Sequence, residues 1–360
     1  MGFILFEILS LALLVALFSA TGRLVEWAVS RGHSAFQPAF VTRQALGMAV
    51  WVAAAFCLAA SGLLARWLVF VLAGVMVLAY LVAAVRGRAA LEMPSRRDVG
   101  LEGLGTAIAA SSMGLLLWAL FLQTIWPAVG WDANVYHLTV PRLWAEAGGF
   151  RPIAFNVYSN WPLNTELLFL VASLLRDYVL AKLIHYWLGV LTLIAVFWIV
   201  RRSAGALYGW FAAALVLCNQ IVLAEFRVAY VDLAFAFFLF LAFLHLQAGL
   251  ERERPGPRDL IVVGLLAGVV AGIKLTGIFA VLCLAILLVL EWPRGRRGEG
   301  VLVRALAVLL LPSGVVLLAW FAKSWVFTGN PVYPFLYGVF GGPSWSPELG
   351  DRLRDWQQGI

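Results

Sequence analysis

Four short groups of polar and aromatic side chains interrupt a sequence that is otherwise strongly apolar. They are "WDANVYH" at 131–137, "EFRVAYVD" at 225–232, "GIKLTG" at 272–277 and "FTGNPVYPF" at 327–335. The first three groups carry carboxylates or cations. A carboxylate can remove a proton from an acceptor hydroxyl, and a cation can stabilise a departing anionic phosphate. These residue types therefore indicate group-transfer chemistry, provided that the fold brings the groups together.

Asp132 precedes a predicted short helix, "VYHLTVPRLWAEAGG", which the Gly-Gly pair at 148–149 ends. An aspartate in this place can cap the helix, accept a proton, or do both. His137 lies in the same helix and is either a phosphate or metal ligand or, as a lone histidine, a structural hydrogen-bonding residue. Glu166 and Arg142 can equally lie on the solvated sides of the loop helices.

Asp232 and Lys274 also have structural alternatives. Asp232 falls in the first turn of a predicted span, where a carboxylate is costly unless it is paired or faces water. Its structural alternative is an ion pair with Arg227. Lys274 lies near the middle of the apolar stretch 260–290. If that stretch is a hairpin, Lys274 is at its apex, and its structural alternative is a lysine that snorkels to the membrane surface.

The composition places these groups in a membrane protein. Hydrophobic residues make up 63% of the 360 residues and charged residues only 12%, whereas a soluble domain carries about a quarter charged residues. We expect an all-α, polytopic transmembrane bundle of about 10–11 spans with interfacial helices in a large outer loop. The expected spans are 3–20, 44–62, 66–85, 104–126, 179–200, 204–223, 230–249, 260–273, 275–290 and 305–324, and a shorter helix at 163–175 lies at the interface or leads into the next span.

The positive charges set the orientation of the spans. Most of the 26 Lys and Arg residues fall in the loops 21–43, 86–103, 201–203, 250–259 and 291–304. Because short loops rich in Lys and Arg stay on the cytoplasmic side, all four polar groups are predicted on the opposite face. The net charge of +7 comes from these short clusters between spans, so we expect no nucleic-acid partner. The three cysteines lie in apolar runs without CxxC spacing, which disfavours disulfide or zinc chemistry.

In order and spacing, the polar groups resemble the GT-C membrane glycosyltransferases, and within them the protein O-mannosyltransferases and lipid A aminoarabinose transferases. The matching positions are Asp132, Tyr136, the Gly-Gly pair 148–149, Pro152, Asp232 and Lys274. Ala133 replaces the second acid of the family's motif, and Asn160-Trp161 replaces the lysine before its proline pair. Both departures are similar to a looser bacterial branch of lipid-carrier-dependent glycosyltransferases. The resemblance covers about residues 104–340, with 1–103 as an N-terminal extension and 341–360 as an outer polar segment.

The resemblance implies inverting transfer of a sugar from a polyprenyl-phosphate donor to an extracytoplasmic glycan, lipid or protein acceptor at the inner membrane of a bacterium. Asp132 would be the general base, Asp232 would help to position the acceptor or sugar, and Lys274 with Arg227 would hold the donor phosphate. The remaining substrate-binding candidates are Tyr136, His137, Glu225, Tyr230 and Asn160. We expect no cofactor, and a divalent metal is left open.

Two other functions are compatible with the same sequence. A transporter or flippase of a lipid-linked sugar also needs charges near the membrane, although closer to its midplane and on repeat-related broken helices. A non-catalytic subunit for envelope-glycan assembly is compatible with the loss of the second acid at Ala133.

Overall fold

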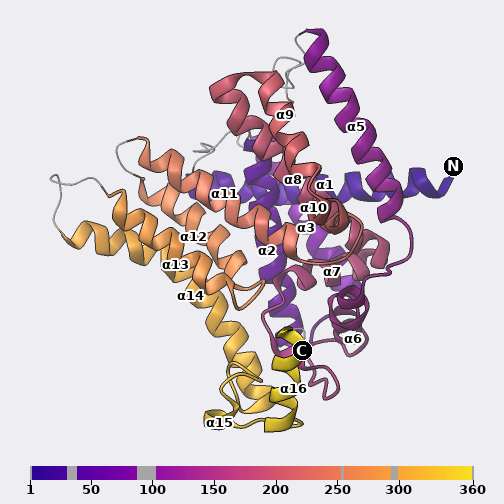
Figure 1. The fold of residues 1–360 in the computed structure, drawn as a ribbon, viewed down its shortest axis with the longest axis vertical. Helices are drawn as coiled ribbons and strands as arrows, with labels where there is room; N and C mark the ends of the chain where they lie inside the picture. The colour runs from indigo at the N-terminus through magenta and orange to yellow at the C-terminus, as the bar shows by residue number, and fades with distance from the viewer. Residues whose placement is uncertain (1, 31–38, 87–102, 253–254, 293–298, 359–360) are drawn as a thin grey trace.

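The computed structural model describes residues 2–30, 39–86, 103–252, 255–292 and 299–358. These residues contain helices and no β-strand, which confirms the predicted all-α bundle (Figure 1). Seven of the described helices are long and apolar enough to cross a membrane. They are α1 (Gly2–Ser30), α2 (Ala39–Ala60), α3 (Arg66–Val85), α5 (Leu104–Thr124), α8 (Tyr178–Ala204), α11 (Asp232–Leu250) and α14 (Glu299–Thr328).

The other predicted spans contain shorter helices, which are α9 (Ala206–Leu217), α12 (Pro257–Ala271) and α13 (Gly277–Leu290). The predicted short helix at 163–175 is α7 (Asn164–Leu175). The connecting segments contain η1 (Ala133–His137), α6 (Thr139–Glu146), η2 (Val157–Asn160) and α10 (Gln220–Glu225), and α15 (Tyr337–Phe340) and α16 (Pro347–Gln358) follow α14. The predicted boundaries of the spans therefore agree with the structure to within a few residues, except that α1 and α14 are longer and the predicted span 204–223 is divided into α9 and α10.

Helix α1 continues about ten residues past the predicted end of its span because its polar residues are paired. Glu26 is buried and receives hydrogen bonds from Arg23 Nη1 (2.6 Å) and from Arg43 Nε on α2 (2.8 Å). A carboxylate within a helix pair is stable only when such partners compensate its lost hydration. Residues 21–30 and 39–43, predicted as a loop, are therefore helical.

Helix α7 is buried on nearly all sides and leads directly into α8. Every residue from Asn164 to Ala172 is buried, and α7 packs against α2 and α8. A helix that is apolar all round belongs inside a bundle rather than on its surface. Of the two predicted positions, the one that leads into the next span is confirmed, because α8 begins at Tyr178.

Helices α11, α12, α13 and α14 lie side by side on one flank of the bundle (Figure 1). Glycines on α12 allow the close approach of α14, since a Cβ atom on Gly264 would lie 2.8 Å from Leu309 O. Small residues at helix contacts are the usual means of close packing in membranes. α14 then extends beyond this flank and carries α15 and α16 at its far end (Figure 1). The N-terminal helices pack against α7, α8 and α12 and so share the same core.

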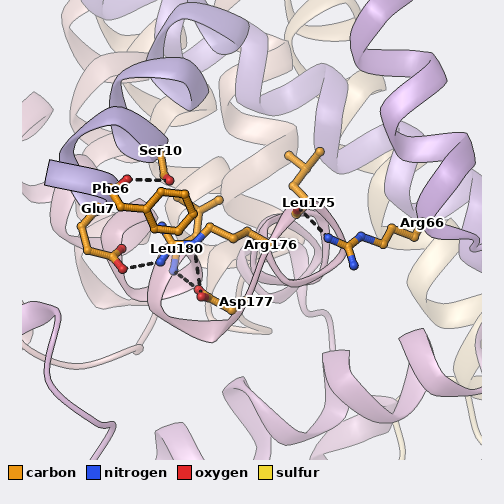
Figure 2. A network of polar contacts seen from close by, with 8 residues as sticks. All are labelled: Phe6, Glu7, Ser10, Arg66, Leu175, Arg176, Asp177 and Leu180. Carbon is orange, nitrogen blue, oxygen red and sulfur yellow. Dashed lines mark hydrogen bonds and ion pairs between the residues drawn. The ribbon is translucent and has the colours of Figure 1, made fainter. Parts of the chain in front are cut away.

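A buried ion pair anchors α1 to the junction of α7 and α8 (Figure 2). Arg176 donates from Nη2 to the fully buried Glu7 carboxylate and from Nε to Asp177 (3.1 Å). The guanidinium also lies over the Phe6 ring, 4.4 Å from its centroid, and Asp177 caps α8 by accepting a hydrogen bond from Leu180 N (3.0 Å). This cluster fixes the start of α8, which carries side chains of the candidate site described below.

Replacing Arg176 with Met should destabilise the protein strongly, because it leaves the Glu7 carboxylate buried and unpaired. Breaking one side of a buried pair costs about 3–5 kcal/mol, whereas removing both charges is often close to neutral. We therefore expect thermal unfolding of the purified protein in lipid nanodiscs to show a large loss of stability for Arg176→Met and recovery of most of it in Glu7→Met/Arg176→Met. A double variant no more stable than the single one would show that the pair does not anchor α1.

Candidate active site

Asp132 begins a short helical segment in the loop between α5 and α7. The following residues, Ala133–His137, form the π-helix η1, and Leu138 N donates to Ala133 O (2.9 Å). Such π turns are frequent at functional sites. Asp132 itself has helical backbone angles, and its carboxylate makes no capping hydrogen bond, so the cap alternative is not supported. The half-buried carboxylate has no hydrogen-bond or ion-pair partner among the described residues, which leaves it available to a substrate.

The two glycines after α6 end this helix as predicted and dock the loop on α2. Gly148 has a φ of +69°, and Gly149 N donates to Trp144 O (3.0 Å) while Gly148 N donates to Ala145 O (3.2 Å). This is the Schellman pattern at a helix C-terminus. A Cβ atom on Gly149 would lie 2.7 Å from Ala59 O, so the loop can approach α2 only without a side chain there.

Three tyrosines surround the Asp132 carboxylate. The Tyr136 ring stacks on that of Tyr158, with centroids 4.5 Å apart. Tyr230 packs over Gly130, where a Cβ atom would lie 2.9 Å from the Tyr230 ring. Burial raises the pKa of all three hydroxyls, and the Asp132 charge raises each of them further. The tyrosines therefore stay protonated and can donate hydrogen bonds beside Asp132.

A buried histidine–glutamate pair packs against these tyrosines. His137 Nδ1 lies 2.5 Å from Glu166 Oε1, and both side chains are almost fully buried. The His137 ring also packs 5.6 Å from that of Tyr230. This arrangement favours the structural alternative for His137. It also shows that the prediction of a solvated Glu166 is wrong, whereas Arg142 is indeed exposed and pairs with Glu146 (3.0 Å).

Asp232 pairs with Lys274, so the predicted alternative of an Asp232–Arg227 pair is wrong. Lys274 Nζ lies 2.7 Å from Asp232 Oδ1, and both side chains are partly exposed. Arg227 instead donates from Nη1 to Gln123 Oε1 (3.3 Å) on α5. Sequence spacing suggested the nearer cation, but the turn between α12 and α13 brings the more distant one to the start of α11.

Lys274 lies at the apex of a tight hairpin formed by α12 and α13, as the sequence predicted. Asn164 at the start of α7 fixes that turn: its backbone N donates to Gly272 O (2.8 Å) and its Nδ2 donates to Val269 O (3.0 Å). A Cβ atom on Gly272 would lie 2.1 Å from Asn164 Nδ2. The position of Lys274 therefore depends on an asparagine that the sequence analysis did not single out.

Glu225 completes the group of carboxylates. Its Oε2 lies 3.9 Å from Nε2 of His185, whose Nδ1 donates to Val228 O (2.8 Å). A separation of 3.9 Å is too long for a hydrogen bond. Burial, together with the charges of Asp232 and Asp132, raises the pKa of Glu225 to about 7, and Lys274 opposes the rise. The protonated form of Glu225 is therefore favoured far more than for an exposed glutamate.

These mutual effects indicate that side chains from η1, α10, α11 and the hairpin lie close together, as one candidate site requires. The charges of Asp132, Asp232 and Lys274 all act on Glu225, and those of Asp132 and Asp232 both act on Tyr136. The candidate site thus contains three carboxylates, of which Asp232 pairs directly with Lys274. Among the described residues, no three His, Cys, Asp or Glu side chains are grouped so as to hold a metal ion.

A second lysine, Lys323 on α14, holds the opposite side of the outer loop. Its ammonium group is buried, donates to Ser159 O in η2, and lies 4.9–5.6 Å from the centroids of four aromatic rings, among them Trp144 and Phe327. Sequence reasoning did not assign it a role, although a lysine inside an apolar 30-residue helix is itself a signal. Asn160 ends η2 and does not reach the Asp232–Lys274 pair through any contact between described residues.

One family model matches part of the chain. Residues 162–328, slightly less than half of the chain, match the family model of dolichyl-phosphate-mannose-protein mannosyltransferase. Asp232 and Lys274 lie inside the match, and Asp132 lies outside it. Comparisons with curated proteins and with solved structures found no match. The predicted resemblance is confirmed: the chain resembles the protein O-mannosyltransferases among the GT-C membrane glycosyltransferases, and the match supports an enzyme with a polyprenyl-phosphate sugar donor.

Proposed function

We propose that the protein transfers a sugar, with inversion, from a polyprenyl-phosphate donor to a hydroxyl of an extracytoplasmic acceptor. The observation that carries the proposal is the unpaired Asp132 carboxylate in the same site as an accessible lysine. The acceptor oxygen attacks the anomeric carbon as its proton passes to Asp132. The bond from that carbon to the phosphate oxygen breaks, and polyprenyl phosphate leaves. Lys274 balances the negative charge that develops on the phosphate.

The donor phosphate would take the place of the Asp232 carboxylate on Lys274. Both members of this pair are partly exposed, and an exposed pair contributes little stability, so exchange of one anion for another costs little. The released Asp232 would then be free to bind hydroxyls of the sugar or acceptor. Arg227, whose partner is the neutral Gln123 amide, would supply a second cation at the rim of the site.

An apolar groove between α11 and α13 would hold the isoprenoid tail of the donor. The groove has a volume of about 520 Å³ and is lined by apolar side chains and Cys283. On α11 its lining begins at Ala236, four residues after Asp232, which corresponds to a rise of about 6 Å along the helix. A lipid with its phosphate on Lys274 could therefore place its tail directly in this groove.

The site also favours an enzyme over a transporter. A transporter of lipid-linked sugars is expected to hold its charges near the midplane on paired broken helices. Here Asp232 is the first residue of α11 and Lys274 lies in a turn, so both charges lie at helix ends.

The transferred sugar would contact the side chains of Tyr136, Tyr230 and Glu225. His137 would hold these side chains in position through its bond to Glu166. We place the site on the extracytoplasmic side of a bacterial inner membrane because of the one-sided distribution of basic loops.

Replacing Asp132 with Asn should abolish most of the transfer without unfolding the protein. General base catalysis contributes roughly 100- to 10,000-fold to a rate. Because Asp132 makes no capping bond, the melting temperature should not change. The measurement uses a panel of radiolabelled polyprenyl-phosphate hexoses and pentoses with the protein in native membranes, and follows release of label from the lipid into a new product.

The control variant for Asp132 is Asp351→Asn, which changes an exposed aspartate on α16 and should transfer at the parental rate. Movement of the intact donor across the bilayer, without cleavage of its sugar–phosphate bond, would identify a transporter instead. Parental turnover by Asp132→Asn would remove Asp132 as the base and direct attention to Asp232 or Glu225.

Replacing Lys274 with Met should weaken donor binding and leave acceptor binding nearly unchanged. A hydrogen bond to a charged group contributes about 1.5–3 kcal/mol, so the Kd for sugar-free polyprenyl phosphate should rise roughly 10- to 100-fold. Lys274→Arg keeps the charge and should retain most of the affinity. The matched control is Arg142→Met, which removes an exposed cation outside the site. If Lys274→Met and Arg142→Met bind polyprenyl phosphate equally well, Lys274 does not hold the phosphate.

A further inference from the structure

A second cavity lies on the predicted outer side of the protein, away from the α11–α13 groove. It has a volume of about 370 Å³, is partly open, and is lined by residues within 152–160 of the outer loop and within the segment from Phe327 to Leu349. In Figure 1 the second of these segments runs through α15 to the start of α16, at the far end of α14. Its volume is at the lower end of the range of small-molecule sites, which suits a ligand about the size of a sugar residue.

Aromatic rings form the walls of this cavity. Phe155 and Phe327 contribute from the two facing segments, and Tyr333 and Trp345 contribute from the segment after α14. The rings of Tyr333 and Trp345 meet edge to face with centroids 6.1 Å apart, and the Tyr333 hydroxyl donates to Pro343 O (2.6 Å). These contacts hold the aromatic faces in place, so a ligand would meet a preformed site.

Two asparagine side chains in the wall have polar atoms without a partner among the described residues. The side-chain amide of Asn160, which is only 9% exposed, makes no hydrogen bond there, and Oδ1 of Asn156 is buried and unpaired although its Nδ2 donates to Val135 O. Buried amides normally have partners, and one without them indicates a ligand or ordered water. Thr328 and Ser344 add hydroxyl groups to the same lining, and no lining residue carries a charge.

Aromatic faces together with a neutral amide and hydroxyls fit a neutral sugar ring. The C–H groups on one face of a pyranose pack against the electron-rich face of an aromatic ring. The amide can both donate to and accept from the sugar hydroxyls. A phosphate or an ionised peptide side chain would find no opposite charge here, and a purely apolar chain would leave the Asn160 amide unpaired.

The cavity and the reaction centre share η2 as a common wall. Asn160 lines the cavity, while Tyr158 in the same short helix stacks on Tyr136 beside Asp132. A second link is Asn156, which lines the cavity and donates from Nδ2 to Val135 O in η1 (2.8 Å). Lys323 fixes η2 from the other side through Ser159 O. A ligand in the cavity therefore lies against the element that positions the residues around the base.

We propose that this cavity is the acceptor subsite and that it binds a neutral sugar residue of a glycan acceptor. The proposal rests on the transferase function proposed above and specifies its acceptor class. The acceptor sugar is held by Asn160 and by the Trp345 ring, and the neighbouring part of the glycan presents its hydroxyl to Asp132. The donor occupies the separate end of the site at Lys274.

The test is saturation-transfer NMR on the purified full chain in lipid nanodiscs, without any lipid donor. The probes are methyl glycosides of glucose, mannose and galactose, disaccharides of these sugars, and acetylated tetrapeptides that contain Ser or Thr. We expect at least one glycoside to bind. Asn160→Ala and Trp345→Leu should each weaken that binding roughly 3- to 10-fold, the effect of one hydrogen bond or one ring contact. Melting temperatures establish that each variant is folded.

The matched control is Phe340→Ala, which removes an exposed ring from the same segment outside the cavity and should bind the glycosides like the parent. The proposal is overturned if no glycoside binds, if neither cavity variant weakens binding, or if the tetrapeptides bind there instead. Because no donor is present, this result is independent of transfer. If the parent protein transfers sugar but binds no glycoside, only the proposed acceptor subsite is ruled out. If it binds a glycoside but transfers no sugar, only the proposed transferase function is ruled out.

Discussion

The ion pair between Asp232 and Lys274 is the interaction on which the rest of the site depends. Each charge lies at the end of an apolar helix, where hydration is incomplete, and each needs an opposite charge. Because both side chains are partly exposed, the pair can open to a competing anion at low cost. A lipid phosphate at the membrane surface is such an anion. Under the proposed function, the same pair would satisfy both charges in the empty protein at little gain in stability and would supply the cation that binds the donor.

The bundle keeps this pair in place through close backbone contacts rather than through the charges themselves. Asn164 clamps the turn that carries Lys274, and the absence of a side chain at Gly272 is what permits the clamp. On the other side, the buried Glu7–Arg176 pair anchors the junction from which α8 begins. A rigid helical frame around a pair of partly hydrated charges meets the general requirement for catalysis by preorganised electrostatics.

Hydrophobic patterning was sufficient to predict the helices, because a span must be apolar over a fixed length. It also predicted Lys274 at the apex of its hairpin. It could not predict which cation meets Asp232, because that depends on the packing of α11 against the hairpin and not on sequence distance. Burial of Glu166 was missed for a related reason. Its partner, His137, lies 29 positions earlier, and neither residue alone indicates a pair.

The outer loop shows the same division between local and long-range information. Its Gly-Gly pair signals the end of α6 by local chemistry alone, and the structure agrees. The cavity beside Asn160 has no such signal, since its walls come from segments almost 200 positions apart. The aromatic group at 327–335, found in the sequence, contributes Phe327 and Tyr333 to this wall.

The most direct measurement is a cryo-EM structure of the protein in lipid nanodiscs with bound polyprenyl phosphate. If Lys274 holds the donor, the phosphate will lie within hydrogen-bond distance of Lys274 Nζ, Asp232 will have turned away from it, and the isoprenoid chain will run between α11 and α13. A phosphate bound elsewhere, with Lys274 and Asp232 still paired and the groove empty of isoprenoid, would contradict this account.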